Sequence, residues 1–203
     1  MTMYIPESIR AEKDFQDCVH FHGHTCMGVT IGYLAAKLAL QQLAIHRSVD
    51  EELITIVEND ACCCDAIQVL TGCTFGKGNF FFKDHGKMAF TFANRLSGEA
   101  IRLVLKPGIF DSPEEERQLA EMIRSGKAAP EEIQRYQKMF EARGEEMFSH
   151  GPAAFFDMQR IALQFPPQAT RATTLPCARC GEMVMESKLE KVNNQLICKG
   201  CLK

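Results

Sequence analysis

The chain has 203 residues, of which 46% are apolar and 24% are charged, and its formal net charge is −3. This composition is typical of a globular protein with room for one sizeable domain and a small second unit. The slight negative charge gives no reason to expect a bulk nucleic-acid partner. Because the N-terminus lacks a basic start with an apolar run, and no uninterrupted apolar stretch is long enough to span a bilayer, we expect a cytoplasmic protein without membrane segments.

The first predicted elements surround a turn rich in histidine and cysteine. Residues 8–18 predict a short amphipathic helix that leads into the run FHGHTC at positions 21–26. In a helix the rings of His22 and His24 would diverge by about 200°, whereas in a turn both can face one point. We therefore expect a loop at this place.

A long helix, a strand and a short helix are expected next. Residues 26–43 are nearly all apolar and predict a mostly buried helix with Thr25 as its N-cap. Residues 53–57 are short and β-branched, which predicts a buried strand. Residues 65–70 predict a short helix that Gly72 would end.

The middle of the chain carries strand patterns. Residues 80–82 and 88–92 flank the run DHGK at positions 84–87, which predicts a hairpin turn with a left-handed glycine. Residues 100–105 predict a further strand.

Two helices and a last strand complete the first domain. The run SPEEE at 112–116 has the cap, proline and acidic first turn of a helix start, and the run PEE at 130–132 opens a second helix. That second helix would turn four apolar side chains inward, namely Ile133, Tyr136, Met139 and Phe140. Alternating apolar residues at 161–165 predict the last strand. Because helices and strands mix without regular alternation, we expect the α+β class.

A small metal module is predicted at the C-terminal end. Its cysteines follow the pattern C-x2-C-x17-C-x2-C, which is inside the spacing of four-cysteine zinc sites. We expect one structural zinc ion, held by Cys177, Cys180, Cys198 and Cys201. The expected division is therefore an α+β domain at 1–165, a linker at 166–176 and a zinc finger at 177–203.

A second metal site is predicted in the first domain. Histidine and cysteine suit zinc and other transition metals, and reduced thiols at this density favour ligands or redox groups over disulfides. The expected ligands lie at the ends of helices and strands: His22, Cys26, Cys62 and Cys73, with His24 as an alternate ligand or base.

Neighbouring residues admit other interpretations. Cys18, Cys63 and Cys64 are more typical of small buried side chains. Asp60 and Asp65 would either cap the short helix or orient the metal ligands. The glycines and Lys77 within residues 72–79 resemble an anion-binding nest, although they match no P-loop pattern.

Several motifs together resemble a known family. They are F-H-G-H-x-C at 21–26, E-x-D-A-C at 58–62, the run at 65–79, and F-x-F-x-D-x-G-K-x-A-F at 80–90. The region from 15 to 165 resembles the E-subunit family of molybdenum or tungsten formylmethanofuran dehydrogenase, and the last cysteines resemble the treble-clef zinc finger that members often add. The resemblance implies a core of mixed β-sheet flanked by helices that is similar to thioredoxin. It also implies a metal-binding active site at the histidine and cysteine motifs, and a dimer.

The chain departs from the family pattern at three places. Met27 stands where the family commonly has proline after the first-motif cysteine. Cys63 and Cys64 stand where relatives carry small or aliphatic residues, which leaves open which thiol of residues 62–64 binds metal. Only two residues follow Cys201, so the helix that normally starts at the second cysteine pair of a treble clef must be absent or vestigial.

Three classes of function remain open at the level of sequence. The first is an accessory metal-binding protein that serves molybdenum or tungsten oxidoreductase subunits. The second is a metal-dependent or thiol-redox enzyme in its own right, and the third is a metal carrier or regulator. The finger has few basic residues and no aromatic ring, so nucleic acid is not favoured. Apolar residues at 26–43 and 80–92 predict a homodimer. The sequence identifies no substrate.

Overall fold

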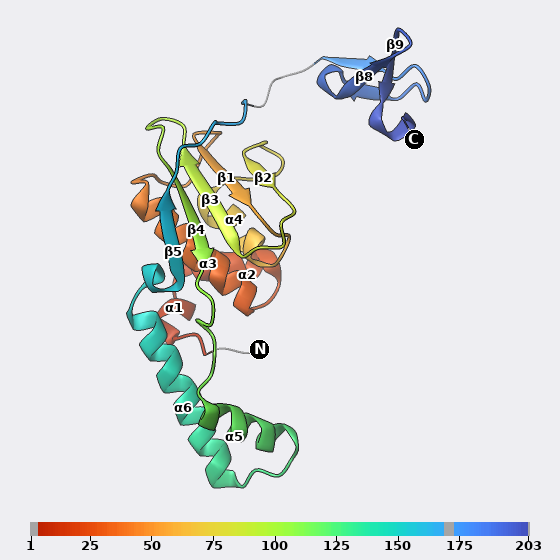
Figure 1. Cartoon of the computed structure of the whole chain (residues 1–203). Coiled ribbons are helices and arrows are strands. Elements are labelled where there is room, and N and C mark those ends of the chain that lie inside the picture. Colours follow the sequence, from red (N-terminus) through yellow and green to blue (C-terminus); the bar gives the residue numbers. More distant parts are fainter. Residues whose placement is uncertain (1–3, 169–172, 203) are drawn as a thin grey trace. The chain divides into compact units, whose positions relative to one another are not determined.

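The computed structural model of the chain describes residues 4–168 and 173–202. It consists of two units that divide between Pro167 and Gln168 (Figure 1). Within the described ranges, none of the helices combines the length and apolarity needed to cross a bilayer. The class is α+β, as the sequence predicted.

Two helices stand where the sequence predicted one at residues 8–18. They are α1, Glu7–Arg10, and α2, Lys13–His22. Glu12 lies between them in an extended conformation, and its carboxylate accepts hydrogen bonds from the Tyr33 hydroxyl at 2.7 Å and from Lys37 Nζ at 3.0 Å. These contacts with α3, Met27–Gln42, hold Glu12 outside the helix.

The first unit is built on a five-stranded sheet with the order β2-β1-β3-β4-β5. The strands are β1 Leu53–Val57, β2 Phe80–Phe82, β3 Ala89–Asn94, β4 Ala100–Leu105 and β5 Phe156–Arg160. The pair β1–β2 is parallel and the other pairs are antiparallel, so the sheet is mixed. The likeness to thioredoxin stays a prediction.

The predicted hairpin at residues 80–92 is wrong. Strands β2 and β3 lie on opposite sides of β1, because the segment between them crosses the end of that strand. Lys83 N–H donates to the Val57 carbonyl at 2.9 Å, and Lys87 N–H donates to the Glu58 carbonyl at 3.0 Å. Gly86 has the expected left-handed conformation, with φ of 64°, but it serves a crossover instead of a hairpin.

Each face of the sheet has its own cover. Helices α2, α3 and α4, Cys63–Thr71, pack on one face (Figure 1). On the opposite face, a small apolar cluster of Ile54, Ile56, Ala93 and Ala100 is covered by Phe81, Ile161, Leu163 and Phe165. The strand predicted at 161–165 is therefore wrong, because β5 ends at Arg160 and the following side chains pack onto the face of the sheet. Arg95 fixes this segment by donating to the Pro166 carbonyl at 2.8 Å.

A helical hairpin extends from the end of the sheet at which β5 begins (Figure 1). It consists of α5, Glu114–Arg124, and α6, Pro130–Ser149, which begin within two residues of the predicted starts. An ion pair between Arg143 and Glu116 at 2.8 Å joins the two helices. The inward packing predicted for α6 is only partial, since Ile133 is exposed while Tyr136 and Phe140 stack on each other. The short 3₁₀ helix Pro152–Phe155 then leads into β5.

The second unit contains four short strands in two antiparallel pairs. They are β6 Thr174–Pro176, β7 Met183–Met185, β8 Leu189–Val192 and β9 Gln195–Cys198. Strand β6 precedes Cys177 and pairs with β7, so it lies within the segment predicted as a linker at 166–176. Residues 169–172 of that linker lie outside the described residues. Single 3₁₀ turns occur at Glu186–Lys188 and Lys199–Cys201, and the latter stands in the place of the treble-clef helix.

Candidate metal centre

The histidine and cysteine turn joins the end of α2 to the start of α3. His22 is the last residue of α2, and Gly23 follows in a left-handed conformation with φ of 97°, which reverses the chain direction. Cys26 is the N-cap of α3, because its Sγ accepts a hydrogen bond from Val29 N–H at 3.4 Å. The prediction of Thr25 as N-cap is therefore wrong by one residue, and a thiol takes the role of the hydroxyl.

Three candidate ligands converge at this turn. One donor atom from each of His22, His24 and Cys26 lies within 4.8 Å of the other two. The His22 Nε2 is 3.8 Å from Cys26 Sγ, and the two imidazole rings are 4.6 Å apart between centroids. Imidazole nitrogen and thiolate are the donors that zinc and related transition metals prefer. Three protein ligands leave one tetrahedral position open, which is typical of functional metal sites.

A carboxylate orients one of these ligands. Asp65, in the first turn of α4, has its Oδ2 2.7 Å from His22 Nδ1. This contact favours a proton on Nδ1 and leaves Nε2 as an acceptor on the side of Cys26. Carboxylates in this position fix the tautomer and orientation of a metal-ligating histidine. Asp65 thus has the orienting contact that the sequence left open, while Asp60 is exposed.

Cys62 approaches Cys26 from a different segment, although its sulfur is not within 4.8 Å of all three converging donor atoms. Burial, followed by the neighbouring Cys26 thiol, raises the pKa of the Cys62 thiol. The two segments approach closely because α3 carries glycine where it crosses the start of α4. A Cβ on Gly28 would lie 2.8 Å from Cys62 Cβ, and one on Gly32 would lie 2.1 Å from the Cys63 carbonyl oxygen. Two glycines four residues apart in this helix were the sequence signal for this contact.

The neighbouring thiols point elsewhere. Cys63 is fully buried and donates to Asn59 Oδ1 at 3.2 Å, while Cys64 donates to the Asn59 carbonyl at 3.2 Å. Cys18 is also buried and contacts the Ala66 carbonyl. Of the three consecutive cysteines at 62–64, Cys62 is therefore the one beside Cys26.

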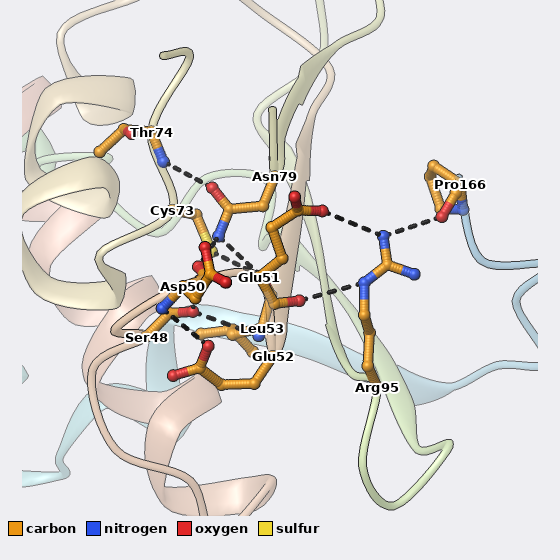
Figure 2. A network of polar contacts seen from close by, with 10 residues as sticks. All are labelled: Ser48, Asp50, Glu51, Glu52, Leu53, Cys73, Thr74, Asn79, Arg95 and Pro166. Atoms are coloured by element: carbon orange, nitrogen blue, oxygen red, sulfur yellow. Dashed lines mark hydrogen bonds and ion pairs between the residues drawn. The ribbon is translucent and has the colours of Figure 1, made fainter. Parts of the chain in front are cut away.

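The structure does not bring Cys73 to this group. Cys73 follows Gly72 at the opposite end of α4, and a nine-residue helix separates its ends by roughly 13 Å. Its thiol donates to the Leu53 carbonyl at 3.3 Å, which also accepts from Asn79 Nδ2 at 3.0 Å (Figure 2). Burial raises the pKa of the Cys73 thiol. Cys73 thus belongs to a buried polar network that anchors the start of β1, not to the metal group.

The four cysteines of the second unit form a separate group. The sulfur atoms of Cys177, Cys180, Cys198 and Cys201 all lie within 4.8 Å of one another. Backbone N–H groups point at them, and the hydrogen bond from Cys198 N–H, at 3.3 Å, contributes most to lowering the pKa of the Cys177 thiol to about 6. Four sulfurs at this separation provide the closed tetrahedral donor set of a structural metal site.

Residues 21–157 match the family described as FmdE, Molybdenum formylmethanofuran dehydrogenase operon. The chain belongs to this family. The match contains the histidine and cysteine turn together with Cys62 and Asp65, so the resemblance seen in the motifs is confirmed.

Two individual proteins are also similar to the chain. A protein of Archaeoglobus fulgidus with the name "Probable S-adenosyl-L-methionine-binding protein" is 27% identical over 177 residues, which cover 84% of this chain and 48% of that protein. The chain thus spans about half the length of this relative. The crystal structure of a tungsten formylmethanofuran dehydrogenase FmdE-like protein from Syntrophus aciditrophicus aligns with a TM-score of 0.61 and 21% identity. The alignment covers 99% of this chain and 96% of that one, and at this identity it establishes the fold.

Proposed function

We propose that the chain is a metal-binding protein that serves a molybdenum or tungsten oxidoreductase as an accessory component. The observation that carries the proposal is the convergence of His22, His24 and Cys26 within 4.8 Å, with Asp65 fixing His22. The family description, which refers to the operon of a molybdenum dehydrogenase, supports the kind of partner.

The donor set favours zinc or another transition metal at the N-terminal site. His22 and His24 offer imidazole nitrogens from the two sides of Gly23, and Cys26 offers sulfur from the start of α3. Cys62 lies beside Cys26 and can supply a fourth ligand or leave that position to another molecule. When bound, a metal with an open position supplies Lewis-acid chemistry at this turn.

The proposal extends to the second unit and to assembly. We propose a structural zinc ion at the four cysteines, since a closed sulfur set suits that role. We also propose a cytoplasmic location, where the ten cysteines, none of which is in a disulfide, would stay reduced. We keep the homodimer as a proposal, although α3 cannot provide its interface because that helix is mostly buried within one chain. Light scattering at micromolar concentration measures the mass.

Elemental analysis of the purified chain tests the metal sites. We expect one equivalent of metal at each site, loss of the first in Cys26→Ala and loss of the second in Cys177→Ser. The control is Cys73→Ala, which removes a thiol outside both groups and should keep both metals. Full metal content in Cys26→Ala would contradict the proposed N-terminal site. Co-purification of the tagged chain with a molybdenum or tungsten enzyme tests the accessory role.

A second candidate function is binding of S-adenosylmethionine. The name of the Archaeoglobus relative refers to this ligand, and the region aligned with that relative covers most of this chain. Together with the open metal position, such binding would support an enzyme in its own right. Isothermal titration with S-adenosylmethionine measures it, and the absence of heat at millimolar ligand would contradict this candidate.

A further inference from the structure

A cleft of about 340 Å³ lies along the exposed side of α4, outside the metal group. Its walls include Phe21 from α2, Phe75 from the loop after α4, Gln68 and Arg47. This volume is within the range of small-molecule sites, which combine apolar walls with a few polar groups. None of the described residues that line it is acidic.

Aromatic rings stand open to solvent at this cleft. The exposed fraction is 85% for Phe75 and 59% for Phe21. Phe75 and Gln68 also border a second cleft of about 260 Å³, which Phe80 and Phe82 line on the other side. Exposed phenylalanine rings in a concave site gain free energy when a flat ring covers them, through apolar burial and stacking. The occupant favoured by these walls is therefore a planar ring.

A side-chain amide lies between the two clefts. Gln68 Oε1 accepts a hydrogen bond from Phe75 N–H at 3.4 Å. Its amide nitrogen has no hydrogen-bond partner within the described parts of the chain, so it can donate to an acceptor such as a ring nitrogen. The amide thus adds a polar contact at the edge of a ring that stacks on Phe75.

One cationic side chain, Arg47, lines the cleft. Arg47 donates from Nε to the Val69 carbonyl at 2.9 Å, and its terminal nitrogens have no partner among the described residues. Lys77, from the glycine-rich loop, donates from Nζ to the carbonyls of Ser48 at 3.1 Å and Val49 at 3.2 Å. These two residues directly follow Arg47 in the sequence. Because the Lys77 amine is already bonded to these carbonyls, the loop does not form an anion-binding nest by itself. It places a second cation near Arg47, whose guanidinium is suited to phosphate or carboxylate.

We propose that this cleft binds an anionic, ring-bearing small molecule of the nucleotide type. The ring lies against Phe75 with Gln68 at its edge, and the anionic group lies at Arg47. Because Phe21 precedes His22 in α2, the bound molecule lies beside the candidate metal group. Binding itself requires no metal, so the proposal stands apart from the proposed metal-binding role.

Titration of the full chain with adenosine 5′-monophosphate, adenosine and inorganic phosphate tests the proposal. We expect the monophosphate to bind about tenfold more tightly than adenosine, and phosphate alone to bind more weakly still. Arg47→Gln should remove the difference between the two nucleoside probes, whereas Phe75→Ala should weaken both. The matched controls are Arg124→Gln and Leu96→Ala, which change exposed side chains outside the cleft and should bind like the wild type.

Three results would overturn the proposal. They are no saturable binding of the monophosphate, wild-type affinity in both Arg47→Gln and Phe75→Ala, and complete displacement of the monophosphate by an equal concentration of phosphate. Elemental analysis of the same samples reports the metal content separately. A chain that keeps its metals but fails to bind the monophosphate therefore refutes the cleft and leaves the metal centre intact.

Discussion

Replacing Gly32 by alanine should lower both stability and metal binding at the N-terminal site. A Cβ at this position would lie 2.1 Å from the Cys63 carbonyl oxygen and 2.8 Å from two further backbone atoms of Cys63. Backbone atoms cannot swing aside as a flexible side chain does, so α4 must move by roughly 1 Å to restore ordinary contact. That movement would also disturb the contact between Asp65 and His22, which is 2.7 Å long.

Two opposing effects decide the size of the change. Alanine in a helix interior is favoured over glycine by about 1 kcal/mol. Overpacking of a tight core costs about 1–3 kcal/mol, and the upper end applies here because the obstacle is backbone. We therefore expect a net loss of about 2 kcal/mol, which lowers the Tm of a domain of this size by roughly 4–8 °C.

Thermal unfolding followed by far-ultraviolet circular dichroism measures this change, because the described α-helices lie in the first unit. The control is Gly76→Ala, where a Cβ would meet no atom within 4 Å. Elemental analysis of the same proteins reports the metal. If Gly32→Ala instead had a higher Tm than the wild type, as the helix propensity of alanine alone would give, the close crossing of α3 and α4 would be refuted.

Three further predictions follow from individual contacts. Asp65→Asn should weaken metal binding at the N-terminal site by about 10–100-fold with little effect on folding, as measured by competition with a chelator, and unchanged affinity would refute the orienting role. Cys198→Ser should unfold residues 174–202 and leave the melting of the first unit unchanged, which amide hydrogen exchange would resolve, whereas loss of the whole fold would contradict two independent units. The hydrogen bonds from Arg102 lower the pKa of the Glu58 carboxyl to about 2. The ionised Glu58 therefore stabilises the fold fully above its ordinary pKa of about 4.5, and this stabilisation is lost as the pH falls toward 2. In Glu58→Gln, the free energy of unfolding should therefore depend less on pH between about 4.5 and 2 than it does in the wild type. A slope equal to that of the wild type would count against the ion pair.

Local sequence patterns determined much of the fold and of both metal groups. The β-branched run at 53–57 and the strand at 100–105 have the predicted bounds, because their side chains favour extended backbone. The four-cysteine pattern correctly predicted that the four sulfur atoms lie together, within 4.8 Å of one another. Cysteines separated by two residues can lie on one tight turn and direct both sulfurs to one point. His22 and His24 converge for a similar reason, because the glycine between them permits a left-handed turn.

Other features depended on which segments meet in space. The run at 80–92 has the local pattern of a hairpin, yet β1 lies between its two strands, and pairing with a distant strand leaves no local mark. Cys62 and Cys73 looked equivalent as residues at segment ends. Only the packing of α4 separated them, because the glycines of α3 bring one end of α4 to Cys26 while the other end lies against the start of β1. Sequence patterns report local conformation, whereas the choice of ligands and strand neighbours is made by close contacts between segments far apart along the chain.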